Sequence, residues 1–224
     1  DIPLELEVRL PDNEHFENRL IVDKDHVKAV TVGGSTLNGT PYAAQVTWQM
    51  LDAEGREVTA GSCTANEAVA FDFGSLPSGD YLLKARTEFR GREITAERKV
   101  VVLSTDDRKL PFKSTYFYYP VKTEGAIEFV LGTTEEDLYL ELELFDGDKQ
   151  LYREGVHLQN EMRKFVLPYK DSYRSAVKMS VFGIREGREL DYTYQFTRPG
   201  DVRLDVAVET FRDKTTPGSE ETMT

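Results

Sequence analysis

The same β-hairpin pattern occurs twice in this chain, at positions 96 residues apart. Gly91 and Gly187 each lie in a short charged turn and are each followed by Arg-Glu and an aliphatic residue, and alternating apolar residues lead into and out of both turns. A glycine turn between two alternating runs predicts a hairpin. A period of this length matches a small domain of about 100 residues, whereas solenoid repeats recur every roughly 20–50 residues. The repeat therefore predicts two consecutive domains of one fold.

Further blocks repeat in the same order outside the hairpin. The corresponding blocks are 29–32 with 126–130, 46–52 with 140–146, and 69–71 with 165–167. Their offsets differ by a few residues, as loop insertions would produce, and their apolar positions agree. A single shared hairpin could arise from alternation alone, but several blocks in the same order favour a duplicated fold.

Alternation of apolar and polar residues at period two dominates the chain, and we find no convincing run at helical spacing. Clear strands are predicted at 4–10, 46–50, 69–73, 138–144 and 202–208. Turn sequences rich in Gly, Asp and Pro separate them, at 52–55, 77–80, 146–148 and 217–218. Short strands at this spacing predict an all-β protein built of antiparallel β-sandwiches.

Two polar breaks divide the chain. The stretch at 104–108 follows an apolar strand and is predicted to be a linker, and 198–201 is the matching break about one period later. We therefore predict a first sandwich at 1–104, a second at 105–199, and the first hairpin of a truncated third sandwich at 200–224. The sequence stops within a predicted strand, so we expect it to be a piece of a longer protein.

Charge and cysteine content narrow the classes of function. The net charge of −12 disfavours binding to nucleic acid and to anionic membrane surfaces, because phosphate groups repel an acidic protein. No run of 18 apolar residues is present to span a bilayer. The single cysteine, Cys63, cannot form an intrachain disulfide, which is neutral on compartment, and its neighbours offer no base to activate it. We expect no nucleic-acid partner and no membrane contact by this chain.

The residues that could support catalysis or metal binding lack the necessary spacing. His15 and His26 lie among acidic residues without a zinc or calcium pattern, and we predict solvated acidic loops there. His157 alternates with apolar neighbours and is predicted to be a strand residue. The acidic run at 135–137 resembles a charged loop more than a pair of glycosidase carboxylates facing each other across a cleft. We predict that the chain has no catalytic, metal-binding or cofactor-binding residue and no cofactor. We also expect that it is not an enzyme.

The most aromatic segment lies at 116–120, directly after the predicted linker. It has two interpretations: a stacking platform for a sugar, or aromatic residues that fill the second sandwich or the seam between domains. Inward aromatics are the usual filling of a sandwich, which favours the second interpretation. The tyrosines that a sugar could use are Tyr116, Tyr118, Tyr119, Tyr192 and Tyr194. Two alternative functions follow: a surface adhesin or carbohydrate-binding module, and an accessory domain of a hydrolase.

The tail carries a family resemblance. Phe211 begins the sequence Phe-Arg-Asp-Lys, which is followed by Pro217, Gly218 and the acidic Glu221. This segment resembles the large α2-macroglobulin-like proteins of Bacteroidetes-type bacteria, in which such a strand and turn open a macroglobulin domain. Met223 stands where an aromatic residue is more usual. The phrases at 38–41 and 76–83 are also typical of such domains.

The resemblance implies tandem macroglobulin domains, which are immunoglobulin/fibronectin-III-like antiparallel β-sandwiches. It implies an envelope protein, periplasmic or anchored to the outer membrane, that traps proteases through a bait segment and sometimes a Cys-x-Glu-Gln thioester. Cys63 is followed by Thr-Ala-Asn, so the thioester motif is missing, and no bait segment is evident. The implied role is a non-catalytic scaffold. Its partners would be neighbouring macroglobulin domains of the same parent chain, with target proteases bound only through that parent.

Overall fold

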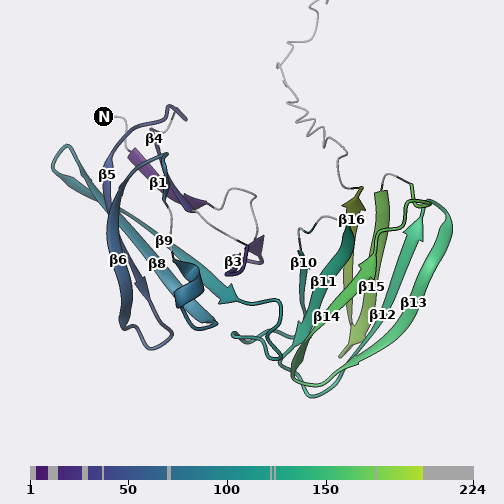
Figure 1. The fold of residues 1–224 in the computed structure, drawn as a ribbon. Helices are drawn as coiled ribbons and strands as arrows, with labels where there is room; N and C mark the ends of the chain where they lie inside the picture. The colour runs from purple at the N-terminus through teal and green to yellow at the C-terminus, as the bar shows by residue number, and fades with distance from the viewer. Residues whose placement is uncertain are drawn as a thin grey trace, which may run out of the picture.

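The computed structural model describes residues 4–9, 15–26, 30–36, 38–69, 72–121, 123, 125–174 and 176–198. Within these ranges the fold is all-β, as predicted: strands form four sheets, with one 3-10 turn at Phe73–Ser75. The sheets are arranged as two β-sandwiches side by side (Figure 1). The predicted hairpin of a third sandwich at 200–224 lies outside the described residues.

The first sandwich has a three-stranded and a six-stranded sheet. The small sheet contains, in order, β1 (Leu4–Arg9), β4 (Val30–Thr36) and β7 (Ala68–Val69). The large sheet contains, in order, β2 (His15–Phe16), β3 (Arg19–Asp23), β9 (Arg92–Leu103), β8 (Gly79–Phe89), β5 (Gln45–Leu51) and β6 (Glu57–Thr64). Alternate residues such as Val46, Met50 and Leu83 are buried between the sheets, as period-two strands require.

The second sandwich has a three-stranded and a four-stranded sheet. The small sheet contains β10 (Phe117–Val121), β11 (Ala126–Thr133) and β14 (Glu161–Pro168). The other contains, in order, β13 (Lys149–Leu158), β12 (Leu138–Asp146), β15 (Ala176–Arg185) and β16 (Arg188–Thr197). Leu142, Val181 and Phe129 are fully buried in its core.

The strand order and register show that the two sandwiches repeat one topology. The order β6-β5-β8-β9 in the first matches β13-β12-β15-β16 in the second. Met50 lies opposite Leu83 in the first copy, and Leu144 lies opposite Met179 in the second. The register shifts directly after Met50 and directly after Leu144, so the same β-bulge recurs. The duplicated fold predicted from the sequence is therefore present.

The two hairpins that revealed the repeat close with the same turn. Arg90 and Gly91 have φ of 51° and 74°, and Glu186 and Gly187 have φ of 50° and 75°. Positive φ at both central residues defines the type I′ turn, whose twist matches that of the flanking strands. Glycine occupies the second position in both copies because it adopts positive φ without steric cost.

Three predictions were wrong in part. The stretch that contains His15 is not a loop throughout, because His15–Phe16 form β2 and Phe16 is buried. Phe73, placed in the strand predicted at 69–73, begins a 3-10 turn. The acidic stretch that contains His26 is not a solvated loop throughout. β3 inserts parallel to β9 and ends at Asp23, whose side chain is fully buried. The apolar run before Asp23 does not alternate, because β3 is buried on both faces, as parallel strands commonly are. The described pairings other than β3–β9 are antiparallel.

Candidate functional site: the junction between the sandwiches

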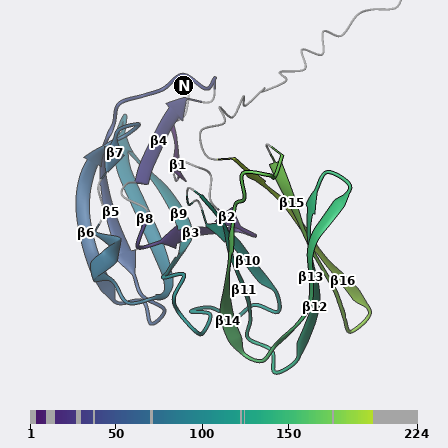
Figure 2. The same cartoon turned by 45° about the vertical axis from the view of Figure 1, so that its right-hand side comes forward.

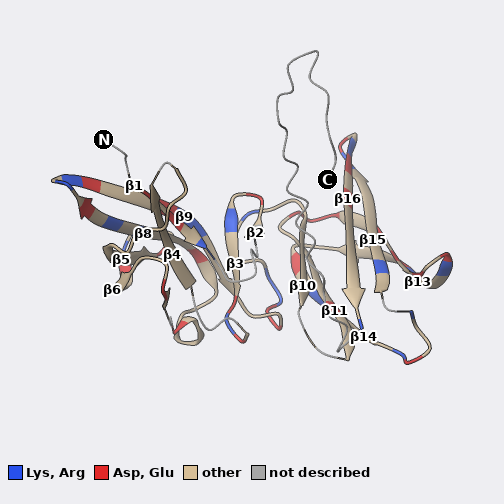
Figure 3. Cartoon of the chain, turned by 90° about the horizontal axis from the view of Figure 1, so that it is seen from above, with Lys and Arg blue, Asp and Glu red and all other residues tan. Residues whose placement is uncertain are grey.

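One apolar cluster contains residues of both sandwiches, and we call it the junction cluster. The first sandwich contributes Phe16, Ile21, Val101 and Leu103, and the second contributes Phe112, Phe117, Tyr119, Val121, Val130 and Met162. None of these side chains is more than 6% exposed. β2 and β3 lie between the body of the first sandwich and β10 (Figures 2 and 3). The inserted hairpin thus supplies one wall of the junction.

Period-two alternation explains how β9 serves two cores at once. Val100 and Val102 point into the first sandwich, whereas Val101 and Leu103 point into the junction cluster. Successive side chains of a strand face opposite sides, so a strand between two apolar layers needs apolar residues at every position. The continuous apolar end of β9 is therefore required by the junction rather than by the first sandwich alone.

The aromatic segment at 116–120 is divided in the same way, and both inward alternatives named above occur. Tyr116 packs in the core of the second sandwich, whereas Phe117 and Tyr119 belong to the junction cluster. Tyr118 packs against both clusters and stacks on Tyr192, with ring centroids 3.4 Å apart. Tyr116 and Tyr119 are buried, so neither is available as an exposed sugar platform.

Edge-to-face ring contacts and one cation–π contact lie at the centre of the junction. The ring of Phe16 meets Phe117 and Tyr118 edge-on, with centroids 5.2 and 5.1 Å away. The Arg19 guanidinium lies over the Phe112 ring, 5.0 Å from its centroid, and approaches Asp80 at 3.6 Å. Edge-to-face pairs each contribute about 0.5–1.5 kcal/mol beyond the area that they bury. The junction thus has specific geometry as well as apolar area.

The predicted linker at 104–108 is held by both sandwiches. On the first side, the Asp107 carboxylate accepts hydrogen bonds from the Ser78 hydroxyl (2.6 Å) and the Ser104 amide (2.9 Å). On the second side, Lys164 approaches Asp106 at 3.0 Å, and the Met162 amide donates to the Arg108 carbonyl (2.8 Å). These contacts restrict a hinge that a free chain of this length would allow.

A buried carboxyl lies at the base of this linker. Asp23 accepts from the Asp25 amide at 3.1 Å, and its second oxygen lies 2.5 Å from His26 Nδ1. Burial raises the pKa of Asp23, although His26 and the amide act in the opposite direction. The Lys24 amide donates to the carbonyl of Leu103, the last residue of β9. Asp23 therefore stabilises the turn at 24–26, which follows β3 and is hydrogen-bonded to the end of β9.

A cleft of about 570 Å³ opens beside the junction cluster. Residues from both sandwiches line it, among them Phe16, Glu17, Tyr116, Tyr118 and Asp191. Burial, with Tyr118 and Asp191 nearby, strongly raises the pKa of the Tyr116 hydroxyl and keeps it protonated. Of the remaining sugar candidates, Tyr192 and Tyr194 are partly buried and lie against each other, with centroids 6.4 Å apart.

Two of the other chemical candidates meet, because His157 Nε2 lies 2.8 Å from a carboxylate oxygen of Asp137 in the acidic run at 135–137. Burial and the charge of Glu67 raise the pKa of the Cys63 thiol, which disfavours the nucleophilic thiolate. His157 is a strand residue, as predicted, and its ring stacks on that of Tyr139. Glu135 forms an ion pair with Arg185 at 3.0 Å. The described part of the chain contains no group of three His, Cys, Asp or Glu side chains placed to hold a metal ion.

No helix among the described residues has the length and apolar character needed to cross a bilayer.

Comparisons with known proteins give distant structural likeness and no family. No protein-family model matches the sequence, and no curated protein matches it. A solved structure described as biofilm associated protein, BSP domain, aligns over 89% of this chain and 30% of its own, with 11% identity and a TM-score of 0.28. Dimeric latent PorU from Porphyromonas gingivalis aligns over 88% and 20%, with 10% identity and a TM-score of 0.32. The chain thus spans less than a third of either protein, and likeness at this level identifies neither a family nor a function.

The resemblance to macroglobulin-like proteins therefore stays a prediction. Its sharpest segment, 208–222, lies outside the described residues. The duplicated sandwich, the second feature on which it rested, is present in the structure.

Proposed function

We propose that this chain is a non-catalytic scaffold segment of an α2-macroglobulin-like protein of the bacterial cell envelope. Its two sandwiches would hold neighbouring domains of the parent chain at a fixed spacing and angle. Protease trapping would belong to the parent, with target proteases bound only through it. The location would be periplasmic or anchored to the outer membrane.

The junction cluster is the observation that supports this proposal most strongly. A scaffold that keeps neighbouring domains at a fixed orientation needs an interface in which the domains do not shift relative to each other. Apolar interfaces with interlocking aromatic side chains resist such shifts better than polar interfaces do. The linker contacts of Asp106 and Asp107 add a second restraint on the same hinge. A chain of independent modules on a flexible string would not require residues such as Ile21 and Val101 to face a second domain.

The carbohydrate-binding alternative fits the contacts less well. A carbohydrate-binding module needs an aromatic face open to the sugar, whereas the candidate tyrosines of this chain pack against other rings or in a core. An accessory domain of a hydrolase would be compatible with the same junction, so the parent sequence has to separate it from the scaffold.

The test is to sequence the gene beyond the codon for Thr224 and to assay the protein that it encodes. We expect further sandwiches of about 100 residues, and cleavage of the parent by a protease that is then retained by it. The 224-residue chain alone, added to the same protease, is expected to leave its activity unchanged. A catalytic domain downstream, or a parent that is cut without retaining the protease, would refute the scaffold role in trapping.

A further inference from the structure

The second sandwich carries an apolar patch on the outer face of its four-stranded sheet. It consists of Tyr139 on β12 and of Phe182 and Ile184 on β15, which are 64%, 43% and 62% exposed. All three lie on the face that points away from the core, because neighbouring residues in the same strands, such as Leu140 and Val181, are buried. We call these three residues the outer patch.

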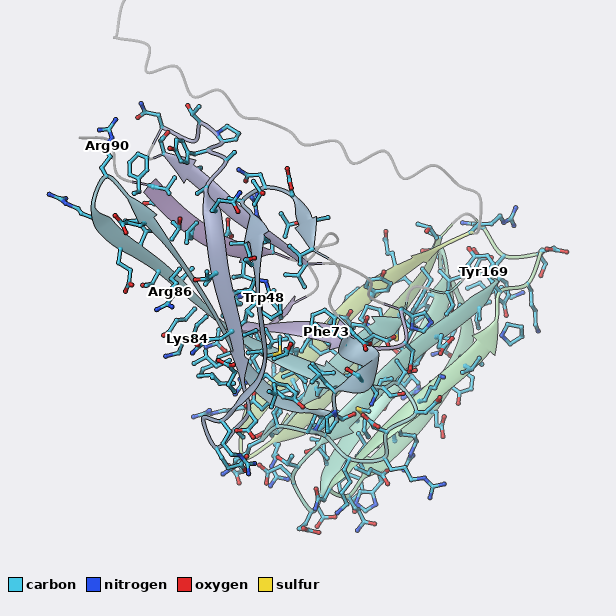
Figure 4. The ribbon with its side chains drawn as sticks, turned by 60° about the vertical axis from the view of Figure 1, so that its left-hand side comes forward. Trp48, Phe73, Lys84, Arg86, Arg90 and Tyr169 are labelled. Atoms are coloured by element: carbon cyan, nitrogen blue, oxygen red, sulfur yellow. The ribbon has the colours of Figure 1, made fainter. Side chains whose placement is uncertain are left out.

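The first sandwich shows that the fold does not require this patch. At the matching positions of the repeat it carries Gln45, Arg86 and Glu88, all exposed. Lys84 and Arg86 lie at the outer side of β8 in Figure 4. The strand order, the bulge and the hairpin turn are the same in the two copies. Apolar residues at these three positions are thus a property of the second copy, and exposed apolar groups gathered together mark interaction surfaces.

Carboxylate side chains on the neighbouring strands lie directly opposite residues of the outer patch. Phe182 lies opposite Glu141 on one side and Asp191 on the other, and Ile184 lies opposite Glu189. Residues that pair across antiparallel strands share a face, so these acidic groups flank Phe182 and Ile184, whereas Tyr139 lies opposite His157. The first copy has Thr47 and Thr95 opposite Arg86. An ion pair with Arg153 partly neutralises Glu141, and the excess negative charge therefore comes from Asp191 and Glu189.

One member of the outer patch is held in place before any partner arrives. The ring of Tyr139 stacks on His157 with centroids 4.1 Å apart and planes 2° apart. His157 Nε2 in turn lies 2.8 Å from a carboxylate oxygen of Asp137. A side chain that is already ordered loses less conformational entropy on binding, which favours affinity.

We propose that the outer patch binds a partner protein whose contact surface combines apolar side chains with Lys or Arg. The acidic border selects the cationic groups, and the outer patch supplies the apolar contact. A second copy of this chain fits poorly, because a two-fold interface would bring the acidic border of one copy against the acidic border of the other. The proposal is independent of the scaffold role, since the outer patch lies on the face opposite the core, although Asp191 and Glu189 also line the cleft beside the junction cluster.

The test uses two labelled peptides of equal length and equal leucine content, one with lysines and one with glutamates between the leucines. Binding to the 224-residue chain is followed by fluorescence anisotropy at two salt concentrations. We expect the lysine peptide to bind at least tenfold more tightly than the glutamate peptide, with affinity that falls as salt rises. The double variant Phe182→Thr with Ile184→Thr is expected to bind the lysine peptide at least tenfold more weakly.

Threonine keeps the net charge and suits an exposed strand, so the double variant separates apolar contact from general attraction to an acidic protein. The matched control is Thr47→Ser with Thr95→Ser on the first sandwich, which is expected to leave binding unchanged. Equal binding by the double variant and the native chain would overturn the proposal. So would concentration-dependent dimerisation of the native chain that the double variant abolishes, because the occupant would then be a second copy.

Discussion

The ring of Phe16 meets the ring of Phe117 edge-on, with centroids 5.2 Å apart, although one residue belongs to the first sandwich and the other to the second. Phe16 lies on the short inserted strand β2, and Phe117 begins β10 directly after the linker region. The contact therefore joins an insertion in one domain to the first strand of the next. It makes the stability of each sandwich depend on the other.

Replacing Phe16 by alanine is expected to lower the free energy of unfolding by about 3–5 kcal/mol, because a buried ring is lost and a cavity remains. Urea unfolding of the native chain and the variant measures this difference. Val58→Ala on β6 is the control: Val58 is 40% exposed, and its loss is expected to cost less than about 1 kcal/mol. Equal losses in the two variants would show that Phe16 does not hold the junction.

The same variant tests whether the sandwiches unfold together. Trp48 is the single tryptophan and lies in the first sandwich, so its fluorescence reports on that unit, whereas far-ultraviolet circular dichroism reports on both. In the native chain the two signals are expected to change at the same urea concentration. In Phe16→Ala they are expected to separate. Separate transitions in the native chain would contradict a coupled junction.

The linker contacts predict how easily a protease reaches residue 108. Asp107→Ala removes the acceptor for both Ser78 and Ser104, and hydrogen bonds to a charged group contribute about 1.5–3 kcal/mol each. Local opening of the linker should therefore become about tenfold or more frequent, and cleavage by trypsin after Arg108 should accelerate in proportion.

Asp106→Ala is the control for this experiment on the same linker. Its side chain is 80% exposed and contacts Lys164 in a surface ion pair, which contributes about 0–1 kcal/mol. Little change in the rate of trypsin cleavage is expected. If Asp106→Ala and Asp107→Ala accelerated cleavage equally, the result would be explained by the loss of a negative charge. The hydrogen bonds that Asp107 accepts from Ser78 and Ser104 would then not be what restrains the linker.

Asp23 predicts a pH dependence of stability with a definite sign. Its pKa in the folded chain is raised above the ordinary value of 3.8, so the folded state holds this proton more tightly than the unfolded state does. The contribution of Asp23 to stability is therefore largest at low pH and falls as the pH rises from about 4 through the raised pKa. Asp23→Asn removes this titration and keeps an acceptor for the Asp25 amide.

The stability of the native chain minus that of Asp23→Asn is expected to decrease between about pH 4 and neutral pH. Urea unfolding at several pH values measures it, and groups that titrate alike in both proteins cancel in the difference. Asp25→Asn is the control, because Asp25 lies on the same turn but its carboxylate is bonded to the Ser104 hydroxyl at an exposed position. Its charge is the smallest of the causes that act on the pKa of Asp23, so most of the pH dependence is expected to remain in this variant. A difference that rises with pH would contradict the assigned direction of the Asp23 shift.

The sequence contained most of the information on the sandwiches and little on the junction. Alternation identified β5, β8, β12 and β15, and the offsets of 94 and 96 matched Met50 to Leu144 and Leu83 to Met179. These features are local, because a strand with one buried face has a period of two wherever its partners lie.

The inserted strand β3 could not be found in this way. It is buried on both faces, so it does not alternate, and it pairs in parallel with β9, whose Val101 lies 80 residues beyond Ile21 in the chain. The one available signal was the continuous apolar end of β9, because four buried residues in a row indicate a strand between two layers. The outer patch could likewise have been found by asking where Phe182 departs from the Arg86 of the first copy.

The repeated type I′ turn supplies the last prediction, in which the chain acts as its own replicate. Arg90 and Glu186 occupy the first central position of the two turns with φ near 50°, a conformation that asparagine and glycine adopt at lower cost than other residues. Arg90→Asn and Glu186→Asn are each expected to raise the free energy of unfolding by about 0.5–1 kcal/mol, because they relieve backbone strain. The smaller gain is expected for Arg90→Asn, which also removes the guanidinium that lies 5.2 Å from the centroid of the Phe89 ring. Gly91→Ala and Gly187→Ala are each expected to lower it by about 1–2 kcal/mol, because alanine disfavours positive φ. Thermal or urea unfolding of the four variants measures these effects. In the two alanine variants the new side chain causes no steric clash, since a Cβ at either glycine would meet nothing within 4 Å. Opposite signs for the two asparagine variants would show that the turns differ in energy although they agree in backbone geometry.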